Sequence, residues 1–271
     1  MSSAQKIIKY VAIAFAVFLI FSIISGIMLG FSMVATVFED DNESITEKLN
    51  MLDISDNASI LNVNISAAKL VIKNGDTLKA ETNNKYIESK QDGNKLTIKE
   101  KKHNWFRKSN NSELIIYIPS DFIFDGIAIE TGAGKVNIEE LVTKELYLDL
   151  GAGKVEIDNL VALDEASIDG GAGEIVINDG AINNLDLDIG VGRFALTSDL
   201  TGNNKVDSGV GEVNINLIGD SSYYKIKLDK GIGSATIDGN NMKDDTYYGN
   251  GSNIVDIDGG VGSIKINFFN K

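Results

Sequence analysis

Cysteine is absent from the 271-residue sequence, and proline, histidine and tryptophan each occur once. Without cysteine the chain cannot form a disulfide, a thiolate metal site, a catalytic thiolate or a lipid-modified cysteine anchor. The single imidazole, that of His103, argues against histidine-dependent catalysis and against a metal site built from several histidines. Only two of the 25 basic residues are arginine, so the arginine cluster common in polysaccharide lyases has no candidate.

Positive charge is also scarce. The 25 basic residues face 39 acidic ones, which gives a formal net charge of −14. We expect no nucleic-acid partner, because phosphates repel so acidic a chain. The hydrophobic fraction of 43% is too high for a disordered chain, and one proline is too few for a collagen-like one. The length suits one large or two small folded domains.

One long uncharged run, residues 11–38, lies near the N-terminus. About 20 apolar residues cross a bilayer as a helix, so this run predicts a transmembrane helix. Lys6 and Lys9 precede the run and acidic residues follow it. Because basic flanks stay on the cytoplasmic side, we expect residues 1–10 in the cytoplasm and the C-terminal part outside a cell membrane that the chain crosses once. The alternative, a cleaved signal peptide, normally has an apolar core of only about 7–15 residues.

Two segments separate this run from a glycine-rich region. Residues 39–59 hold seven acidic residues and one lysine, which predicts a solvated acidic tether. Residues 60–125 contain alternating apolar and polar runs, such as Ile60–Ile65 and Glu113–Ile118, with Asn-Gly and Asp-Gly turns between other runs. We expect this second segment to form an N-terminal β part that caps the repeats after it.

Glycine dominates the rest of the chain, where 23 of the 27 glycines lie between Gly126 and Gly262. A motif of an acidic residue, one variable residue and Gly-x-Gly occurs seven times. The first five copies follow one another at steps of 19 or 20 residues, and the last two at steps of 22 and 29. The acidic residues are Glu130, Asp149, Asp169, Asp188, Asp207, Asp229 and Asp258. The glycine pairs are Gly132 and Gly134, Gly151 and Gly153, Gly171 and Gly173, Gly190 and Gly192, Gly209 and Gly211, Gly231 and Gly233, and Gly260 and Gly262.

Alternating apolar residues flank each motif, as Leu146, Leu148 and Leu150 precede the second copy and Val155 and Ile157 follow it. Repeated coils of 19–20 residues, each with two or three short strands, are typical of a β-solenoid in which each coil pairs with the next. A β-propeller would need a period of about 40 residues. We therefore predict an all-β fold, with a β-solenoid over residues 126–271, preceded by one transmembrane helix. The glycines should form corners, and the Ala, Val or Ile between them should point inward.

In three features the chain resembles the bacterial membrane-anchored family of putative adhesins, a domain family of unknown function. These features are the serial Gly-x-Gly motifs, the Ile118-Pro119 step that ends a strand before them, and the final Gly260–Ile266 strand. The resemblance covers about residues 55–271. It implies a right-handed β-solenoid and a location at the cell surface, and it brings no catalytic residue with it. Some relatives lie in operons that sense envelope stress.

Stacked coils would place the seven acidic residues in one row with a spacing of about 4.8 Å. Neighbouring carboxylates would then repel one another by about 1 kcal/mol in water. The row has three interpretations: carboxylates that accept hydrogen bonds from N–H groups of the glycine corner, a Ca²⁺ site, or a ligand-binding row. The nine-residue Ca²⁺ solenoid motif is not matched. We favour the structural role and expect no metal and no cofactor.

A basic and aromatic cluster lies within residues 60–125, which have 11 basic and 8 acidic residues, whereas residues 126–271 have 11 and 24. Its members are Lys101, Lys102, His103, Trp105, Phe106, Arg107 and Lys108. Such a cluster can contact anionic lipid, the phosphates of a wall polymer or a partner protein. The alternative is a long hairpin loop whose aromatic residues fold back onto the domain.

These patterns predict a non-catalytic protein of the bacterial cell envelope, an adhesin or scaffold whose β-solenoid lies outside the membrane. The expected partners are a cell-wall polymer, a surface glycan or another membrane protein. One alternative is an accessory regulator of a membrane-bound envelope-stress sensor or transporter. A lesser alternative is a β-helical enzyme acting on polysaccharides with paired carboxylates. Pairs such as Asp186/Asp188 alternate with core residues, as ordinary outward strand positions do.

Overall fold

The computed structural model describes residues 48–55, 57–101 and 112–269. The predicted cytoplasmic residues 1–10, the predicted transmembrane helix 11–38 and the first part of the predicted tether lie outside the described residues. So do residues 102–108 of the basic cluster. In the residues that are described, no helix is long and apolar enough to cross a membrane.

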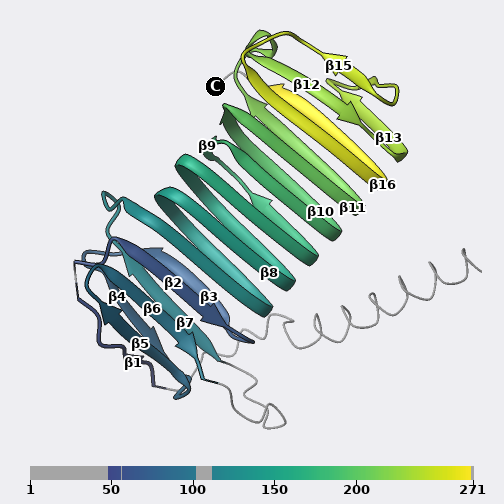
Figure 1. The fold of residues 1–271 in the computed structure, drawn as a ribbon. Helices are drawn as coiled ribbons and strands as arrows, with labels where there is room; N and C mark the ends of the chain where they lie inside the picture. Colours follow the sequence, from purple (N-terminus) through teal and green to yellow (C-terminus); the bar gives the residue numbers. More distant parts are fainter. Residues whose placement is uncertain (1–47, 56, 102–111, 270–271) are drawn as a thin grey trace, which may run out of the picture. The chain divides into compact units, whose positions relative to one another are not determined.

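The described chain is all β, and its strands form one open, sixteen-stranded sheet (Figure 1). One short 3-10 turn, η1 (Ser221–Tyr223), interrupts the strands. The strands are β1 (Asn50–Met51), β2 (Ile60–Ile65), β3 (Lys69–Asn74), β4 (Lys79–Thr82), β5 (Ile87–Asp92), β6 (Lys95–Glu100), β7 (Glu113–Ile118), β8 (Phe124–Ile177), β9 (Gly180–Asn183), β10 (Leu185–Thr201), β11 (Asn203–Ile218), β12 (Tyr224–Asp229), β13 (Ile232–Ile237), β14 (Asn240–Asn241), β15 (Thr246–Tyr248) and β16 (Asn253–Phe269).

The long strands stack in parallel so that equivalent residues of successive repeats lie opposite one another. Asp188 of β10 lies opposite Asp169 of β8 and Asp207 of β11. Gly192 lies opposite Gly173 and Gly211 in the same way. The partners are 19 residues apart, so each repeat contributes one rung of the stack. The predicted all-β, solenoid-like fold is therefore confirmed, whereas the right-handed coiling stays a prediction.

The rungs do not follow chain order at the C-terminal end. Strand β16 pairs with β11 on one side and with β12 and β13 on the other, so Asp258 lies between Asp207 and Asp229. The seventh motif thus occupies the rung between the fifth and the sixth. The reason is that β14 and β15 pair antiparallel with β13 and β12 on their outer side. The last strand of the chain must therefore return inside them.

The N-terminal end has a similar arrangement. Strands β2 and β3 pair with the start of β8, and β6 and β7 form the next parallel rung outward. Strands β5 and β4 then pair antiparallel with β6 and β7, and β1 pairs with β4. Ala58 is fully buried. The described residues from 48 onward thus belong to the folded domain. The acidic tether predicted for residues 39–59 therefore does not include its described part, residues 48–55 and 57–59.

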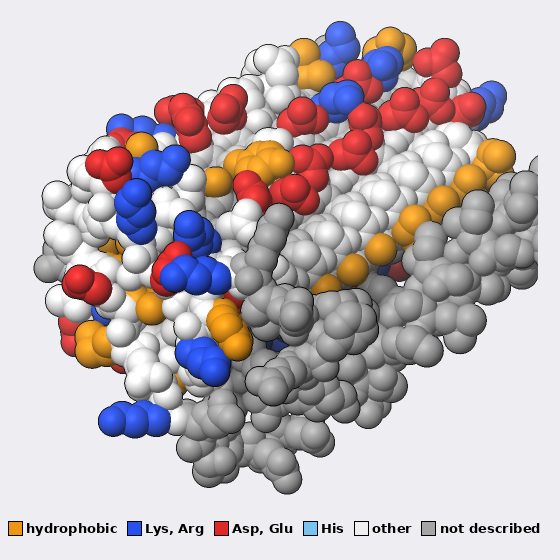
Figure 2. Space-filling model, turned by 60° about the horizontal axis from the view of Figure 1, so that its bottom comes forward, with side chains coloured by type: hydrophobic (Ala, Val, Ile, Leu, Met, Phe, Trp, Pro, Cys, Tyr) orange, Lys and Arg blue, Asp and Glu red, His pale blue; other side chains and the backbone are white. Residues whose placement is uncertain are grey.

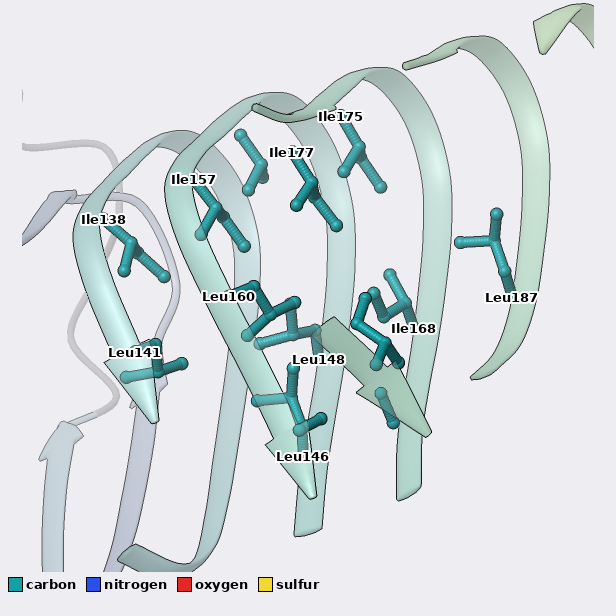
Figure 3. Close-up of a cluster of buried hydrophobic side chains, with 14 of the residues drawn as sticks. Ile138, Leu141, Leu146, Leu148, Ile157, Leu160, Ile168, Ile175, Ile177 and Leu187 are labelled. Atoms are coloured by element: carbon teal, nitrogen blue, oxygen red, sulfur yellow. The ribbon is translucent and has the colours of Figure 1, made fainter. Parts of the chain in front are cut away.

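The core lies inside the rungs, where aliphatic side chains of successive repeats stack. Leu146 and Leu148 point inward before a glycine corner and Ile157 points inward after it, as the alternation predicts. Figure 3 shows Ile138, Ile157 and Ile177 stacked along the interior. Full burial of each such side chain stabilises the fold by about 1.5–3 kcal/mol. The core therefore fixes the register, and the register decides which residues gather on the outside.

Candidate functional site: the corner rows

The glycine corners of successive rungs are in close backbone contact. A Cβ atom built on Gly192 would lie 1.8 Å from the carbonyl oxygen of Gly173, and one on Gly151 would lie 2.2 Å from that of Gly132. At both positions of the motif the Cβ direction points along the stack, where a neighbouring rung leaves no room. The second glycine also has a positive φ, as in Gly211 at +150°.

The sixth corner, that of Gly231 and Gly233, departs from the expected order of the coils. Pairing each coil with the next in chain order would place Gly233 beside Gly211, and this expectation is wrong, because Gly233 lies opposite Gly262 of the seventh motif. A Cβ atom on Gly233, whose φ is +155°, would lie 1.8 Å from the carbonyl oxygen of Gly262. Gly233 is exposed, since β14 pairs only with the far end of β13. Its carbonyl oxygen accepts a hydrogen bond from Nζ of Lys230 at 2.8 Å.

The residue between the two glycines faces outward, so the prediction that it fills the corner from inside is wrong. Val261 is 47% exposed and Ile232 is 75% exposed. With both flanking Cβ directions along the stack, the middle side chain is left on the outer side of the bend. We name these residues the corner apolar row: Ala133, Ala152, Ala172, Val191, Val210, Val261 and Ile232. Figure 2 shows a row of hydrophobic side chains on this face.

The seven acidic residues form a second row, the corner acidic row, whose order in the stack is Glu130, Asp149, Asp169, Asp188, Asp207, Asp258 and Asp229. The expected hydrogen bond from a corner N–H group is formed at Asp229, which accepts one from Gly231 at 3.2 Å. Glu130 accepts a hydrogen bond from the amide of Asn64, and Asp207 accepts one from Lys205 at 2.5 Å. The other described members of the row have no such bond.

Repulsion along the acidic row raises the pKa of a carboxyl within the row and of a tyrosine beside it. Partial burial raises the pKa of Asp169, and the carboxylates of Asp149, Asp188 and Asp186 raise it further. Burial also raises the pKa of the Tyr147 hydroxyl, with a further contribution from Asp149. Uncompensated negative charge therefore gathers near the middle of the row.

The rows on either side of the corner are largely neutralised. In the row outside the acidic one, Asp186, Lys205, Asp256 and Lys227 alternate in charge from rung to rung. Lys227 approaches Asp256 to 3.0 Å. The pair Asp186/Asp188 thus occupies two ordinary outward positions of one strand. Nothing in this geometry singles out two carboxylates for general acid and base catalysis.

A comparable neutralised row lies beyond the apolar row. Its members Glu174, Arg193 and Glu212 lie opposite one another in successive rungs. Arg193 donates to Glu174 at 2.6 Å, and Lys265 pairs with Glu212 at 3.1 Å. Within the described part of the chain, no group of three or more acidic or histidine side chains is placed to hold a metal ion.

Of the predicted basic cluster, the structure describes Lys101. Its Nζ lies 2.5 Å from a carboxylate oxygen of Glu88, and its N–H donates to the carbonyl oxygen of Tyr86. Lys102, His103, Trp105, Phe106, Arg107 and Lys108 lie outside the described residues. This segment joins β6 to β7, and Lys99 of β6 is aligned through Asn64 with Glu130.

Sequence reasoning also missed a polar groove of about 400 Å³ between β3, β7 and the first turns of β8. Its lining includes Lys69, Lys73, Glu113, Glu139 and Asp158. Strands β3 and β8 are paired here at only three positions, Leu70–Val136, Val71–Asn137 and Ile72–Ile138. No motif marks the groove, because its residues come from three separate strands.

Comparison with known proteins places the fold in context. The model of the Toastrack DUF4097 family matches residues 51–252. A solved structure of a putative cell adhesion protein from Clostridium sporogenes is 20% identical, with 82% of this chain and 99% of that chain covered and a TM-score of 0.39. A putative adhesin from Bacteroides fragilis is 15% identical, with coverage of 82% and 98% and a TM-score of 0.37.

A putative adhesin from Parabacteroides distasonis is 14% identical, with coverage of 82% and 96% and a TM-score of 0.36. No curated protein matches the chain.

Proposed function

The chain belongs to the Toastrack DUF4097 family, and from this premise we propose that it is a non-catalytic surface protein of the cell envelope. In this proposal a right-handed β-solenoid of 19–20-residue coils stands outside the membrane as a scaffold or adhesin. Residues 11–38 anchor it with the N-terminus in the cytoplasm, as the long uncharged run and the preceding lysines suggest.

The observation that carries the proposal is the pairing of the two corner rows. Repeated units present an apolar row, exposed at Val261 and Ile232 and half-buried elsewhere, beside an acidic row, and both rows extend over the same seven rungs. Such a surface offers many equivalent contacts along its length, as solenoid binding faces do. An enzyme would instead need one rung that differs from its neighbours by a set of convergent groups.

Site-specific photo-crosslinking in intact cells tests this function. A photoreactive residue at Val210, in the corner apolar row, is compared with one at Leu163, which is 46% exposed away from that row. We expect the Val210 probe to capture a wall polymer, surface glycan or envelope protein, and the Leu163 probe to capture much less. A third probe within residues 11–59 tests the regulatory alternative.

Two outcomes would contradict the proposal. Equal capture from Val210 and Leu163 would show that the corner is not a binding face. Links confined to residues 11–59 and to one integral membrane protein would assign the protein to the regulation of that partner instead. Because the chain has no cysteine, disulfide artefacts do not complicate either comparison.

A further inference from the structure

The corner apolar row changes character along the stack. Alanine occupies the rungs of β8, whereas Val191, Val210, Val261 and Ile232 occupy the last four rungs and lie opposite one another in register. Val261 and Ile232 are 47% and 75% exposed, and Val191 and Val210 are half-buried. Single exposed apolar residues are normal on a protein surface, but a contiguous group flanked by polar residues marks an interaction site.

The same four rungs carry the acidic residues Asp188, Asp207, Asp258 and Asp229. Three positions separate each carboxylate from the apolar residue of its rung, which corresponds to about 10 Å along an extended strand. Between the two rows lies the glycine corner, whose surface is largely backbone except in the last rung, where Nζ of Lys230 donates to the carbonyl oxygen of Gly233. Figure 2 shows acidic and hydrophobic side chains on this face with a band of other atoms between them.

We infer that this four-rung corner binds a basic amphipathic α-helix of a partner protein, lying along the stack with its cations on the acidic row and its aliphatic edge on the valines and Ile232. Asp207 is already paired with Lys205, but the excess negative charge of Asp188, Asp258 and Asp229 selects a cationic partner and disfavours an anionic membrane. This inference rests on the proposed function and names the class of partner for the same surface.

The spacing of the rungs favours a helix over an extended peptide. Rungs repeat about every 4.8 Å, so four rungs span about 14 Å. Residues on one face of a helix recur about every 5.4 Å and would span about 16 Å over three turns, a difference smaller than half a rung. Same-side residues of an extended strand recur about every 6.7 Å and would span about 20 Å. A helix diameter of about 10–12 Å also bridges the two rows.

Fluorescence anisotropy with the full chain in zwitterionic nanodiscs tests the inference. The probe is a labelled synthetic helix about five turns long, with lysines on one face and leucines beside them. One control peptide has the same composition in scrambled order. A second has lysines at alternate positions, as an extended peptide needs. We expect the helical probe to bind at least about tenfold more tightly than either control, and its binding to weaken with added salt.

Two matched variants locate the binding. D258N/V261S changes one carboxylate and one apolar residue of the corner rows, whereas L163S/D164N makes the same kinds of change at exposed residues elsewhere. We expect D258N/V261S to weaken binding about tenfold and L163S/D164N to leave it within about twofold. Ile232→Ser, at a residue that is 75% exposed, serves as a second test should the double variant melt early.

Equal binding of the scrambled peptide, tighter binding of the alternating peptide, or full binding by both D258N/V261S and Ile232→Ser would overturn the inference. These results would leave the proposed function standing, because the crosslinking comparison between Val210 and Leu163 does not depend on a helical partner. Equal crosslinking from those two sites would refute the function whatever the peptides do.

Discussion

At the scale of single residues, the corner glycines carry the strongest constraint in the molecule. Their need for glycine comes mainly from the neighbouring rung, because a side chain at Gly192 or Gly211 would enter the carbonyl group of the corner below it. A positive φ adds to this constraint at the second glycine. The repeated motif is therefore a signature of close stacking, and it leaves the residue between the glycines free to face a partner.

Gly192→Ala should unfold or strongly destabilise the domain, because its Cβ would lie 1.8 Å from the Gly173 oxygen at a φ of +145°. We expect a loss of more than about 3 kcal/mol in the free energy of unfolding, measured by chemical denaturation. Gly126→Ala is the control, since a Cβ there meets no atom within 4 Å. Equal effects of the two substitutions would contradict the stacking explanation.

Asp169→Asn should stabilise the fold at neutral pH. Burial and the neighbouring carboxylates raise the pKa of Asp169, so the folded state binds its proton more tightly than the unfolded state. The stability contributed by the protonated form is therefore lost as the pH rises through the folded pKa. We expect the asparagine variant to gain less than about 1 kcal/mol in the free energy of unfolding near pH 7 and to lose this gain in acid. Thermal melts across the pH range measure the difference.

Asp125→Asn provides a comparison of opposite sign. A hydrogen bond from Lys144 at 2.7 Å lowers the pKa of Asp125, so its ionised form stabilises the fold and that stability is lost as the pH falls through the folded pKa. The asparagine variant should melt earlier than the natural chain near pH 7 and converge with it in acid. A gain in stability at neutral pH for Asp125→Asn would show that the electrostatic account is incorrect.

Tyr224→Phe tests a buried hydroxyl near the C-terminal cap. Burial and Asp199 raise the pKa of Tyr224 to about 12, and its hydroxyl donates to the carbonyl oxygen of Ile218 at 2.7 Å. Stability from the protonated hydroxyl is complete below the unfolded pKa near 10 and is lost as the pH rises towards 12. We expect the natural chain to lose its advantage of about 0.5–1.5 kcal/mol over this range. A difference between the two chains that stays constant up to pH 12 would count against this.

At the scale of elements, the stack depends on strands that sequence order does not place together. Period-two alternation predicts the inward residues, as Leu148 and Ile157 show, and the 19-residue step predicts the register of Asp169 and Asp188. The position of β16 between β11 and β12, which gives Gly233 its neighbour, could not be predicted, because the motif alone does not say which rung a strand joins. The two antiparallel ends decide it, and their short strands carry no repeat.

Removing residues 253–271 should therefore collapse the C-terminal end, although these residues lie beyond the family match at residues 51–252. Strand β16 supplies pairing partners to β11, β12 and β13 at once, and its loss exposes the edge of β11. Unpaired strand edges promote aggregation. We expect the truncated chain to aggregate or melt at a much lower temperature in light scattering and circular dichroism. A truncated chain that stays monomeric with an unchanged melting temperature would refute this topology.

At the scale of the whole chain, charge and repeat together place side chains of one kind in rows along the surface. The acidic excess predicted from composition is concentrated in rows, and alternating pairs such as Lys227 and Asp256 neutralise the rows beside the corner. The sequence reveals these rows because each member recurs at a fixed step. It does not reveal the outward direction of Val210 and its equivalents, which depends on how two adjacent glycine corners pack.

Thiol labelling of single-cysteine variants in intact cells tests the central claim most directly, because the natural chain has no competing cysteine. Val210→Cys places a thiol in the corner apolar row, and Leu148→Cys places one in the core. A membrane-impermeant maleimide should label Val210→Cys rapidly in intact cells and should label Leu148→Cys only after denaturation. Protection of both Val210→Cys and Leu163→Cys, which is exposed away from the corner, in intact cells with labelling after lysis would contradict the extracytoplasmic display of the domain. Protection that persists until denaturation would contradict its outward orientation.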